Sequence, residues 1–200
     1  MKSVRYKALS GLLAGLLLIQ SAWAELPVNP RLGGDFSLSS TLDHPAALAD
    51  FKGKVVLLNF GYTSCPDVCP MVVSRMTQVM KALGDKADAV QPLFVSFDGE
   101  RDTVEKLRAY LNYFDPRFIG MTGSAEQIAA VAKQYGVIYI KQEQGSAGVF
   151  YSHSDFIYLL DQQGRVRALY ANDVKTDRMK SDIESLLAEP SETKPWWKLW

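Results

Sequence analysis

The sequence has no excess of positive charge and contains only two cysteines and two histidines. Its 22 basic residues equal its 22 acidic residues in number, and three of the basic ones fall within the first 24 positions. The remaining chain therefore carries 19 basic against 22 acidic side chains. This weakly acidic balance argues against a nucleic-acid partner, for which a basic face is expected.

A long apolar run is also missing, although the first 24 residues differ from the rest. Basic residues precede an apolar run over 8–19, which is shorter than the ~20 residues that a membrane span needs. Residues 22–24, Ala-Trp-Ala, have the small-x-small pattern of a signal-peptidase site. No cysteine follows Ala24 directly, so a lipid anchor is not expected there. We predict that residues 1–24 are a signal peptide for export to the periplasm and that residues 25–33 are a linker.

The rest of the chain has the composition of one globular domain, which we place at residues 34–188. The sequence is 48% hydrophobic, 11% aromatic and 22% charged, which suits a substantial core. Its apolar patterns and turn residues predict strands that alternate with helices, then a β-hairpin and a last helix. We expect strands at 34–39, 54–60, 92–97, 137–140, 156–160 and 165–170, helices at 66–83, 102–114, 124–135 and 175–187, and a polar loop at 141–148.

This order is that of a thioredoxin-like fold, an α/β architecture with a central mixed sheet flanked by helices. The extra helix and the extended N-terminal segment are the peroxiredoxin-like insertions on that fold. Topology alone leaves the function open.

Cys65 and Cys69 stand directly after the predicted strand at 54–60, whose β-branched and aromatic run suits burial on both faces. If Pro66 opens the following helix, Cys65 lies at the helix mouth and Cys69 one turn further on, on the same face. The helix dipole there favours thiolate over thiol. A purely structural disulfide is unattractive, because the chain-entropy model gives so small a loop only about 2 kcal/mol. We therefore expect a functional pair that can be dithiol, disulfide or metal-bound.

His153 is the candidate third ligand, because it precedes the penultimate strand, where a thioredoxin-like chain approaches the cysteine helix. Two thiolates and an imidazole suit copper, as Cu(I), Cu(II) or both, whereas structural zinc normally takes a fourth protein ligand. We interpret His44 as a solvated loop residue and Asp98 as a turn or cap residue. Asp67 is interpreted as a first-turn carboxylate that complements the helix dipole.

Asp102 is the expected cap of the helix at 102–114. Ser124 and Gln127 fit a capping box at the start of the helix at 124–135, and Gly136 is expected to end that helix.

Several motifs together resemble the Sco/SenC family over about residues 34–187. They are Gly61-Tyr62-Thr63, Cys65-Pro66-Asp67-Val68-Cys69-Pro70, Asp98-Gly99-Glu100-Arg101-Asp102-Thr103, Phe114-Asp115-Pro116-Arg117-Phe118-Ile119-Gly120 and His153-Ser154. The resemblance implies a thioredoxin-like, periplasmic or membrane-tethered copper protein. By position, it implies that Cys65, Cys69 and His153 are the copper ligands.

The resemblance also implies a function: delivery of copper to, or preparation of the cysteines of, the dinuclear copper centre of cytochrome c oxidase. The expected partner is the copper-bearing subunit of that oxidase or another periplasmic copper or thiol protein. The alternative is a thiol-disulfide oxidoreductase of periplasmic redox homeostasis, in which Cys65 and Cys69 are the catalytic redox pair. Whether the protein is an enzyme stays open, with a metallochaperone favoured.

The C-terminal segment 189–200 is rich in tryptophan and lysine. One interpretation is a frayed or folded-back terminus, and the other is a membrane interface or docking segment. The protein is thus expected to be soluble or membrane-associated, in the latter case through its N-terminal segment or this tail.

Overall fold

The computed structural model describes residues 26–143 and 149–189 of the chain. The predicted signal peptide, the loop over 144–148 and the tail from residue 190 onward lie outside the described residues. Within the described ranges, no helix has both the length and the apolar character needed to cross a membrane.

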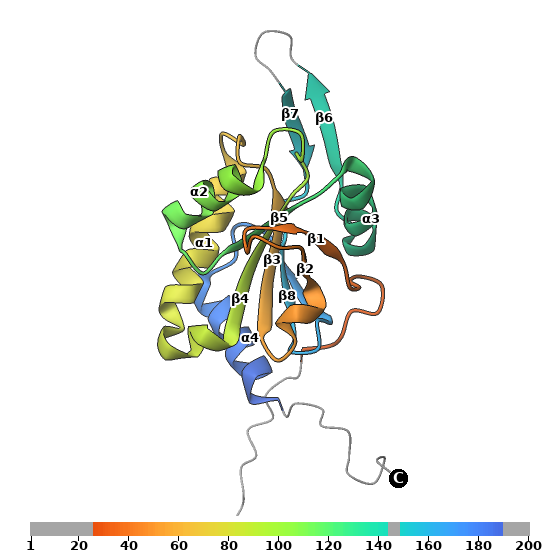
Figure 1. The fold of residues 1–200 in the computed structure, drawn as a ribbon. Helices are drawn as coiled ribbons and strands as arrows, with labels where there is room; N and C mark the ends of the chain where they lie inside the picture. Colours follow the sequence, from red (N-terminus) through yellow and green to blue (C-terminus); the bar gives the residue numbers. More distant parts are fainter. Residues whose placement is uncertain (1–25, 144–148, 190–200) are drawn as a thin grey trace, which may run out of the picture.

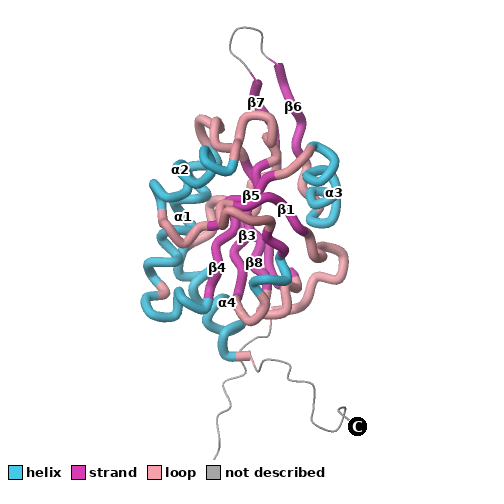
Figure 2. The backbone as a smooth tube through the Cα atoms, viewed as in Figure 1, coloured by secondary structure: helices cyan, strands magenta, loops and turns pink. Residues whose placement is uncertain are grey.

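A mixed sheet of seven strands forms the centre of the described domain (Figure 1; Figure 2). Its three central strands β3, β4 and β5 run parallel, and the other pairings are antiparallel. The strands in spatial order are β2 (Ala46–Ala47), β1 (Ser37–Ser40), β5 (Ile119–Thr122), β4 (Val90–Ser96), β3 (Val55–Gly61), β8 (Ile157–Leu160) and β9 (Val166–Tyr170). The predicted central mixed sheet is therefore confirmed, although β2 and β5 were not predicted.

Helices cover both faces of this sheet, so β3, one of its central strands, is buried along its whole length. Val55 and Leu57 pack into one apolar cluster, while Val56 and Leu58 pack into the cluster on the opposite face. The first cluster is completed by α1 (Val68–Ala82), α2 (Val104–Phe114) and α4 (Thr176–Ala188), and the second by α3 (Ala125–Tyr135). Two short 3₁₀ helices, η1 (Leu48–Phe51) and η2 (Gly84–Ala89), complete the described helices.

The predicted caps of α3 are confirmed. Ser124 Oγ accepts a hydrogen bond from Gln127 N, and the Gln127 side chain accepts one from Ser124 N, which is a capping box. Gly136 follows the helix with φ of 65°, a left-handed conformation that glycine adopts readily.

The start of α1 differs from the prediction. The helix begins at Val68 with Asp67 as its N-cap, so Pro66 precedes the helix and Cys65 lies outside it. Pro70 explains the difference, because it occupies the third helical position, where the backbone N–H has no partner within the helix. A helix that began at Pro66 would place Pro70 where an intrahelical hydrogen bond is required.

A second difference is a two-stranded antiparallel ribbon of β6 (Tyr139–Glu143) and β7 (Val149–His153), which protrudes from the domain (Figure 1). We predicted a strand at 137–140 and a polar loop at 141–148, and we placed His153 just before the penultimate strand and outside any strand. Instead, His153 is the last residue of β7 and pairs with Tyr139 of β6. The ribbon was missed because β6 is mostly exposed and polar, so it lacks the apolar alternation of a half-buried strand.

The described part of the predicted linker contacts the domain. Asn29 N donates a hydrogen bond to Val166 O at 2.8 Å, and Gly33 N donates one to Gln134 O at 2.9 Å. The buried Arg167 donates through Nε to the carbonyl of Leu26.

We expect Leu58→Ala to destabilise the domain by about 2–5 kcal/mol, because Leu58 is 0% exposed and its truncation leaves a cavity in the core. Urea unfolding measures the change in the free energy of unfolding. Leu42→Ala is the matched control, because Leu42 is 41% exposed, and it should shift that free energy by less than about 0.5 kcal/mol. Equal losses in the two variants would contradict the assignment of Leu58 to the core.

Candidate metal centre

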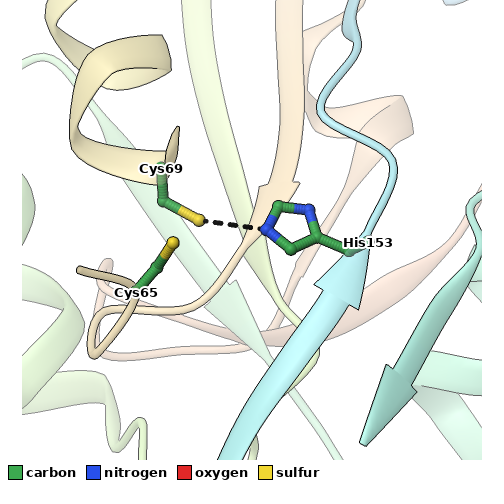
Figure 3. Close-up of side chains that lie close together, drawn as sticks. All are labelled: Cys65, Cys69 and His153. Carbon is green, nitrogen blue, oxygen red and sulfur yellow. Dashed lines mark hydrogen bonds between the residues drawn. The ribbon is translucent and has the colours of Figure 1, made fainter. Parts of the chain in front are cut away.

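The two cysteines lie on different structural elements. Cys65 is on the turn between β3 and α1, where its N–H donates a hydrogen bond to Tyr62 O at 3.3 Å. Cys69 is in the first turn of α1 and is only 1% exposed, whereas Cys65 is partly accessible. The predicted helical i, i+4 spacing is therefore wrong, but the turn still brings the two sulfurs together (Figure 3).

Gly61 lets Cys69 pack against the end of β3. A Cβ atom at Gly61 would lie 2.9 Å from Cys69 Sγ and 2.9 Å from the Phe94 ring, closer than real side chains approach. The glycine therefore gives the sulfur room beside the strand.

His153 reaches the cysteines from the end of β7 (Figure 3). Its ring lies against Phe97 and Tyr62, with centroid distances of 5.1 and 6.0 Å. Nδ1 lies 2.9 Å from Ser154 O and can only donate to that carbonyl, so in the neutral ring, the form that binds a metal ion, the lone pair is on Nε2. Nε2 in turn lies 3.4 Å from Cys69 Sγ, so the lone pair faces the sulfurs.

The structure thus brings together the three residues that the sequence singles out. Sγ of Cys65, Sγ of Cys69 and a ring nitrogen of His153 all lie within 4.8 Å of one another. Thiolate sulfur and imidazole nitrogen are the donor types that suit copper and zinc. The cluster can therefore hold one metal ion through three side chains.

The two thiols have very different proton affinities. A hydrogen bond from Cys69 lowers the pKa of Cys65 to about 3, with further help from His153 and from backbone N–H groups of α1's first turn. The same hydrogen bond to Cys65, together with burial, raises the pKa of the Cys69 thiol well above its ordinary range. The metal-free pair therefore holds one thiolate on the accessible Cys65 and one proton on the buried Cys69.

The Cys65 thiolate also affects the pKa of His153. Burial disfavours its charged form, but contacts with Cys65 and with the Ser154 carbonyl outweigh this effect and raise the pKa of the imidazole. The thiolate and the ring thus stabilise each other's charged forms, as in an ion pair.

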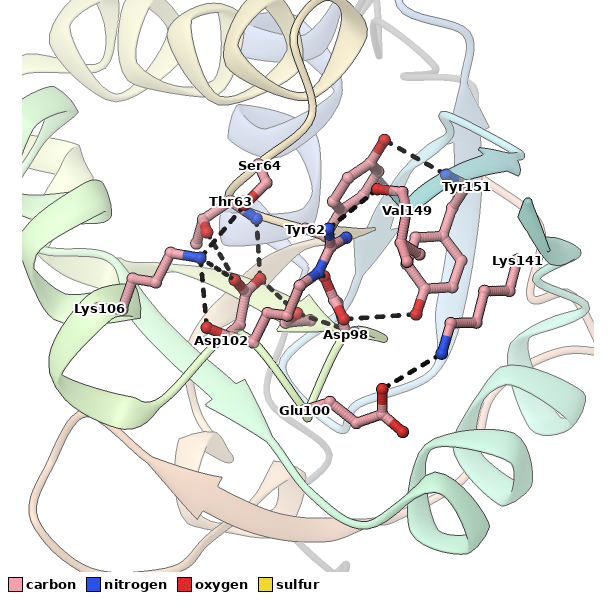
Figure 4. A network of polar contacts seen from close by, with 12 residues as sticks. Tyr62, Thr63, Ser64, Asp98, Glu100, Asp102, Lys106, Lys141, Val149 and Tyr151 are labelled. Carbon is pink, nitrogen blue, oxygen red and sulfur yellow. Dashed lines mark hydrogen bonds and ion pairs between the residues drawn. The ribbon is translucent and has the colours of Figure 1, made fainter. Parts of the chain in front are cut away.

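Side chains of the β4–α2 connection hold β7 in place (Figure 4). Arg101 donates through Nε to Asp98 at 2.5 Å and through Nη1 to Val149 O at 2.9 Å. The Tyr151 hydroxyl donates to Asp98, which is 1% exposed, and Tyr62 OH accepts from Tyr151 N. The Asp98 carbonyl accepts two backbone hydrogen bonds, so its predicted turn role is confirmed, and its carboxylate also ties the site to the ribbon.

Asp102 was predicted to cap α2, and this prediction is wrong. The N-cap is Thr103, whose side chain accepts from Lys106 N, while Asp102 is 0% exposed and bonds to the cysteine turn instead. The adjacent Asp and Thr are both good caps, so the sequence could not distinguish them by residue type.

The side chains of the other two candidates, His44 and Asp67, are not part of the cluster. His44 is exposed, and its Nδ1 lies 2.8 Å from Pro45 O, as expected for a solvated loop residue. Asp67 is exposed at the N-cap of α1, and its side chain makes no capping hydrogen bond. Its placement beside the helix N-terminus agrees with a dipole role.

Comparison with known proteins gives one consistent match. A family model described as SCO1/SenC matches residues 24–188. The bovine mitochondrial protein SCO2 homolog is 39% identical over 161 residues, which is 78% of this chain and 59% of that protein. A SCO2-like protein of Rickettsia felis is 35% identical over 68% of each chain. The match thus spans little more than half of the bovine protein.

Solved structures of the same kind resemble the fold. Copper-bound ScoI of Bradyrhizobium japonicum has a TM-score of 0.73 and is 34% identical over 78% of this chain and 99% of its own. BsSco, described as a Sco-family cytochrome c oxidase assembly protein with a disulfide switch, has a TM-score of 0.66 and is 25% identical, over 80% of this chain and 96% of its own. The thioredoxin-like fold class is confirmed by these likenesses.

We expect iodoacetamide to alkylate Cys65 in the reduced, metal-free protein at nearly the same rate at about pH 5 and pH 7. The reason is that the pKa of Cys65 near 3 keeps it ionised throughout this interval, whereas an ordinary thiol loses its thiolate about a hundredfold. Mass spectrometry of the alkylated peptides measures the rate at each cysteine. Cys69→Ala removes the hydrogen-bond donor, so the alkylation rate of Cys65 in this variant should decrease as the pH is lowered from 7 to 5. A steep decrease over the same interval in the unaltered protein would contradict the thiolate assignment.

Proposed function

The chain belongs to the SCO1/SenC family, and on that premise we propose that it is an exported copper-binding protein that serves the assembly of cytochrome c oxidase. Copper is the cargo, and Cys65, Cys69 and His153 bind it. The observation that carries the proposal is the convergence of two sulfurs and a ring nitrogen within 4.8 Å from three separate segments.

The donor set fits copper in both oxidation states. Soft sulfur ligands select Cu(I), and a nitrogen ligand lets the same site hold Cu(II). Nε2 of His153 keeps its lone pair toward the sulfurs because Nδ1 donates to Ser154 O. Cys65 supplies a ready thiolate, and metal binding displaces the proton of Cys69.

The proposed role is to deliver copper to the dinuclear copper centre of cytochrome c oxidase or to prepare the cysteines of that centre. Copper-bound relatives from Bradyrhizobium japonicum and Arabidopsis thaliana support the cargo, and the description of BsSco supports the assembly role. The partner is then the copper-bearing oxidase subunit or another periplasmic copper or thiol protein. Residues 34–188 form the copper-binding domain in this proposal, and residues 1–24 direct export to the periplasm.

Thiol-disulfide exchange is the second candidate function. The accessible Cys65 thiolate with the buried Cys69 thiol behind it is the arrangement of an attacking and a resolving cysteine. In that reaction Cys65 attacks a partner disulfide, and Cys69 then releases the reduced partner while the Cys65–Cys69 disulfide forms. His153 is not needed for these steps, so its placement at the sulfurs favours metal binding.

We expect the reduced protein to bind about one Cu(II) or one Cu(I), and His153→Ala to weaken Cu(II) binding by roughly a hundredfold or more. We expect the loss of a ligand to reduce metal affinity by more than the 10–100-fold that is typical when a hydrogen-bond partner of a ligand is removed. Cu(I) binding should change less, because both thiolates remain. Competition titration against chelators of known affinity measures both constants.

His44→Ala is the matched control, because it removes the other, exposed histidine. It should leave both affinities unchanged. Negligible copper binding by the unaltered protein, with His153→Ala reducing a test disulfide as fast as that protein does, would contradict the copper proposal and support the redox pair.

A further inference from the structure

The backbone just before Cys65 is held mainly from outside the turn. The turn lies between the end of β3 and the start of α1, and one backbone–backbone hydrogen bond closes it, from Cys65 N to Tyr62 O at 3.3 Å. On its other side, the backbone N–H groups of Asp67 and Cys69 bind the Cys65 sulfur, while Asp67 adds no side-chain capping bond. The position of Cys65 therefore also depends on what binds the residues just before it.

The carboxylate of Asp102 binds those residues (Figure 4). Its Oδ2 accepts from Thr63 N at 2.8 Å, and its Oδ1 accepts from Thr63 Oγ1 at 2.5 Å. Both the backbone and the side chain of Thr63 are thus fixed to one group, two positions before Cys65.

The same carboxylate is anchored to the rest of the domain. Ser96 Oγ, at the end of β4, donates to it at 2.7 Å. Lys106 Nζ, on α2, lies 3.1 Å from Oδ1 and also 3.2 Å from Ser64 Oγ (Figure 4). Asp102 therefore links the cysteine turn to a central strand and to a helix.

Burial makes this link specific for a carboxylate. Asp102 is 0% exposed, and a buried charge is tolerated only when it is well paired. Four donors converge on its two oxygens, and a carboxylate accepts all four without donating. An asparagine would turn an N–H₂ group toward at least one of those donors.

We propose that Asp102 is the positioning residue of the metal centre, which holds the turn so that Cys65 stays within reach of Cys69 and His153. This inference rests on the proposed function as far as copper is concerned. Asp102 does not touch the metal ligands' donor atoms in this role; it acts through Thr63 and Ser64.

Thr63→Val tests the proposal with little risk to folding, because valine keeps the shape and the backbone N–H while it removes the hydroxyl that Asp102 binds. Thr77→Val is the matched control, because the hydroxyl of the buried Thr77 also makes one hydrogen bond, to Val73 O inside α1, away from the turn. The variant keeps the backbone hydrogen bond to Asp102 and loses one hydrogen bond to a charged group, which corresponds to a change of about tenfold or more. We expect the dissociation constant for Cu(II) to rise by about that factor in Thr63→Val only.

Amide hydrogen exchange in the reduced, metal-free protein provides a measurement that is independent of copper. The amides of residues 63–67 should exchange about tenfold faster in Thr63→Val, while those in the centre of β3 stay protected in both variants. Asp102→Asn should show the same pattern more strongly. Its control is Asp115→Asn, because Asp115 is also buried but binds Arg117 at the other end of α2.

The outcomes separate the two claims. If the unaltered protein binds copper and Thr63→Val binds it equally well, the positioning inference is overturned. If the unaltered protein binds no copper, the proposed function fails, and the exchange comparison alone decides the inference. Exchange in the turn that is equal in Thr63→Val and Thr77→Val overturns it in either case.

Discussion

Pro70 determines where the cysteine helix begins, and the candidate metal centre depends on that starting point. Pro70 can lie only in the first turn of a helix, so α1 starts at Val68 and not at Pro66. Cys69 then points inward beneath Gly61, while Cys65 remains on a turn that is partly open to solvent. The same start leaves the Cys65 turn without a helix to hold it, which explains why side chains from the β4–α2 connection bind it.

The difference in burial between the two sulfurs gives the site its chemistry. The accessible sulfur carries the negative charge, and the buried one retains the proton that stabilises it. His153 adds a lone pair whose direction is fixed by the Ser154 carbonyl. Such a site exposes one thiolate to incoming copper or to a partner, while its other two donors are already oriented.

Local signals in the sequence predicted much of the fold and the identity of the three candidate ligands. The buried strand β3 and the capping box of α3 were predictable because each depends on residues that lie within a few positions of one another in the sequence. The ribbon that carries His153 was not predicted, because the exposed residues of β6 do not show the alternation of a buried face. The hydrogen bonds of Asp102 were not predicted for a related reason. Thr63 is distant from Asp102 in the sequence and Ser96 lies on β4, so no local sequence pattern indicates that they bind Asp102.

We propose that Cys65, Cys69 and His153 bind one copper ion together. X-ray absorption spectroscopy of the copper-loaded protein at the copper edge reports which atoms surround the ion. We expect two sulfur scatterers and one imidazole nitrogen in the Cu(II) form, and no imidazole signal in His153→Ala. A copper environment without sulfur, or one that is identical in His153→Ala, would show that these three residues do not bind copper together.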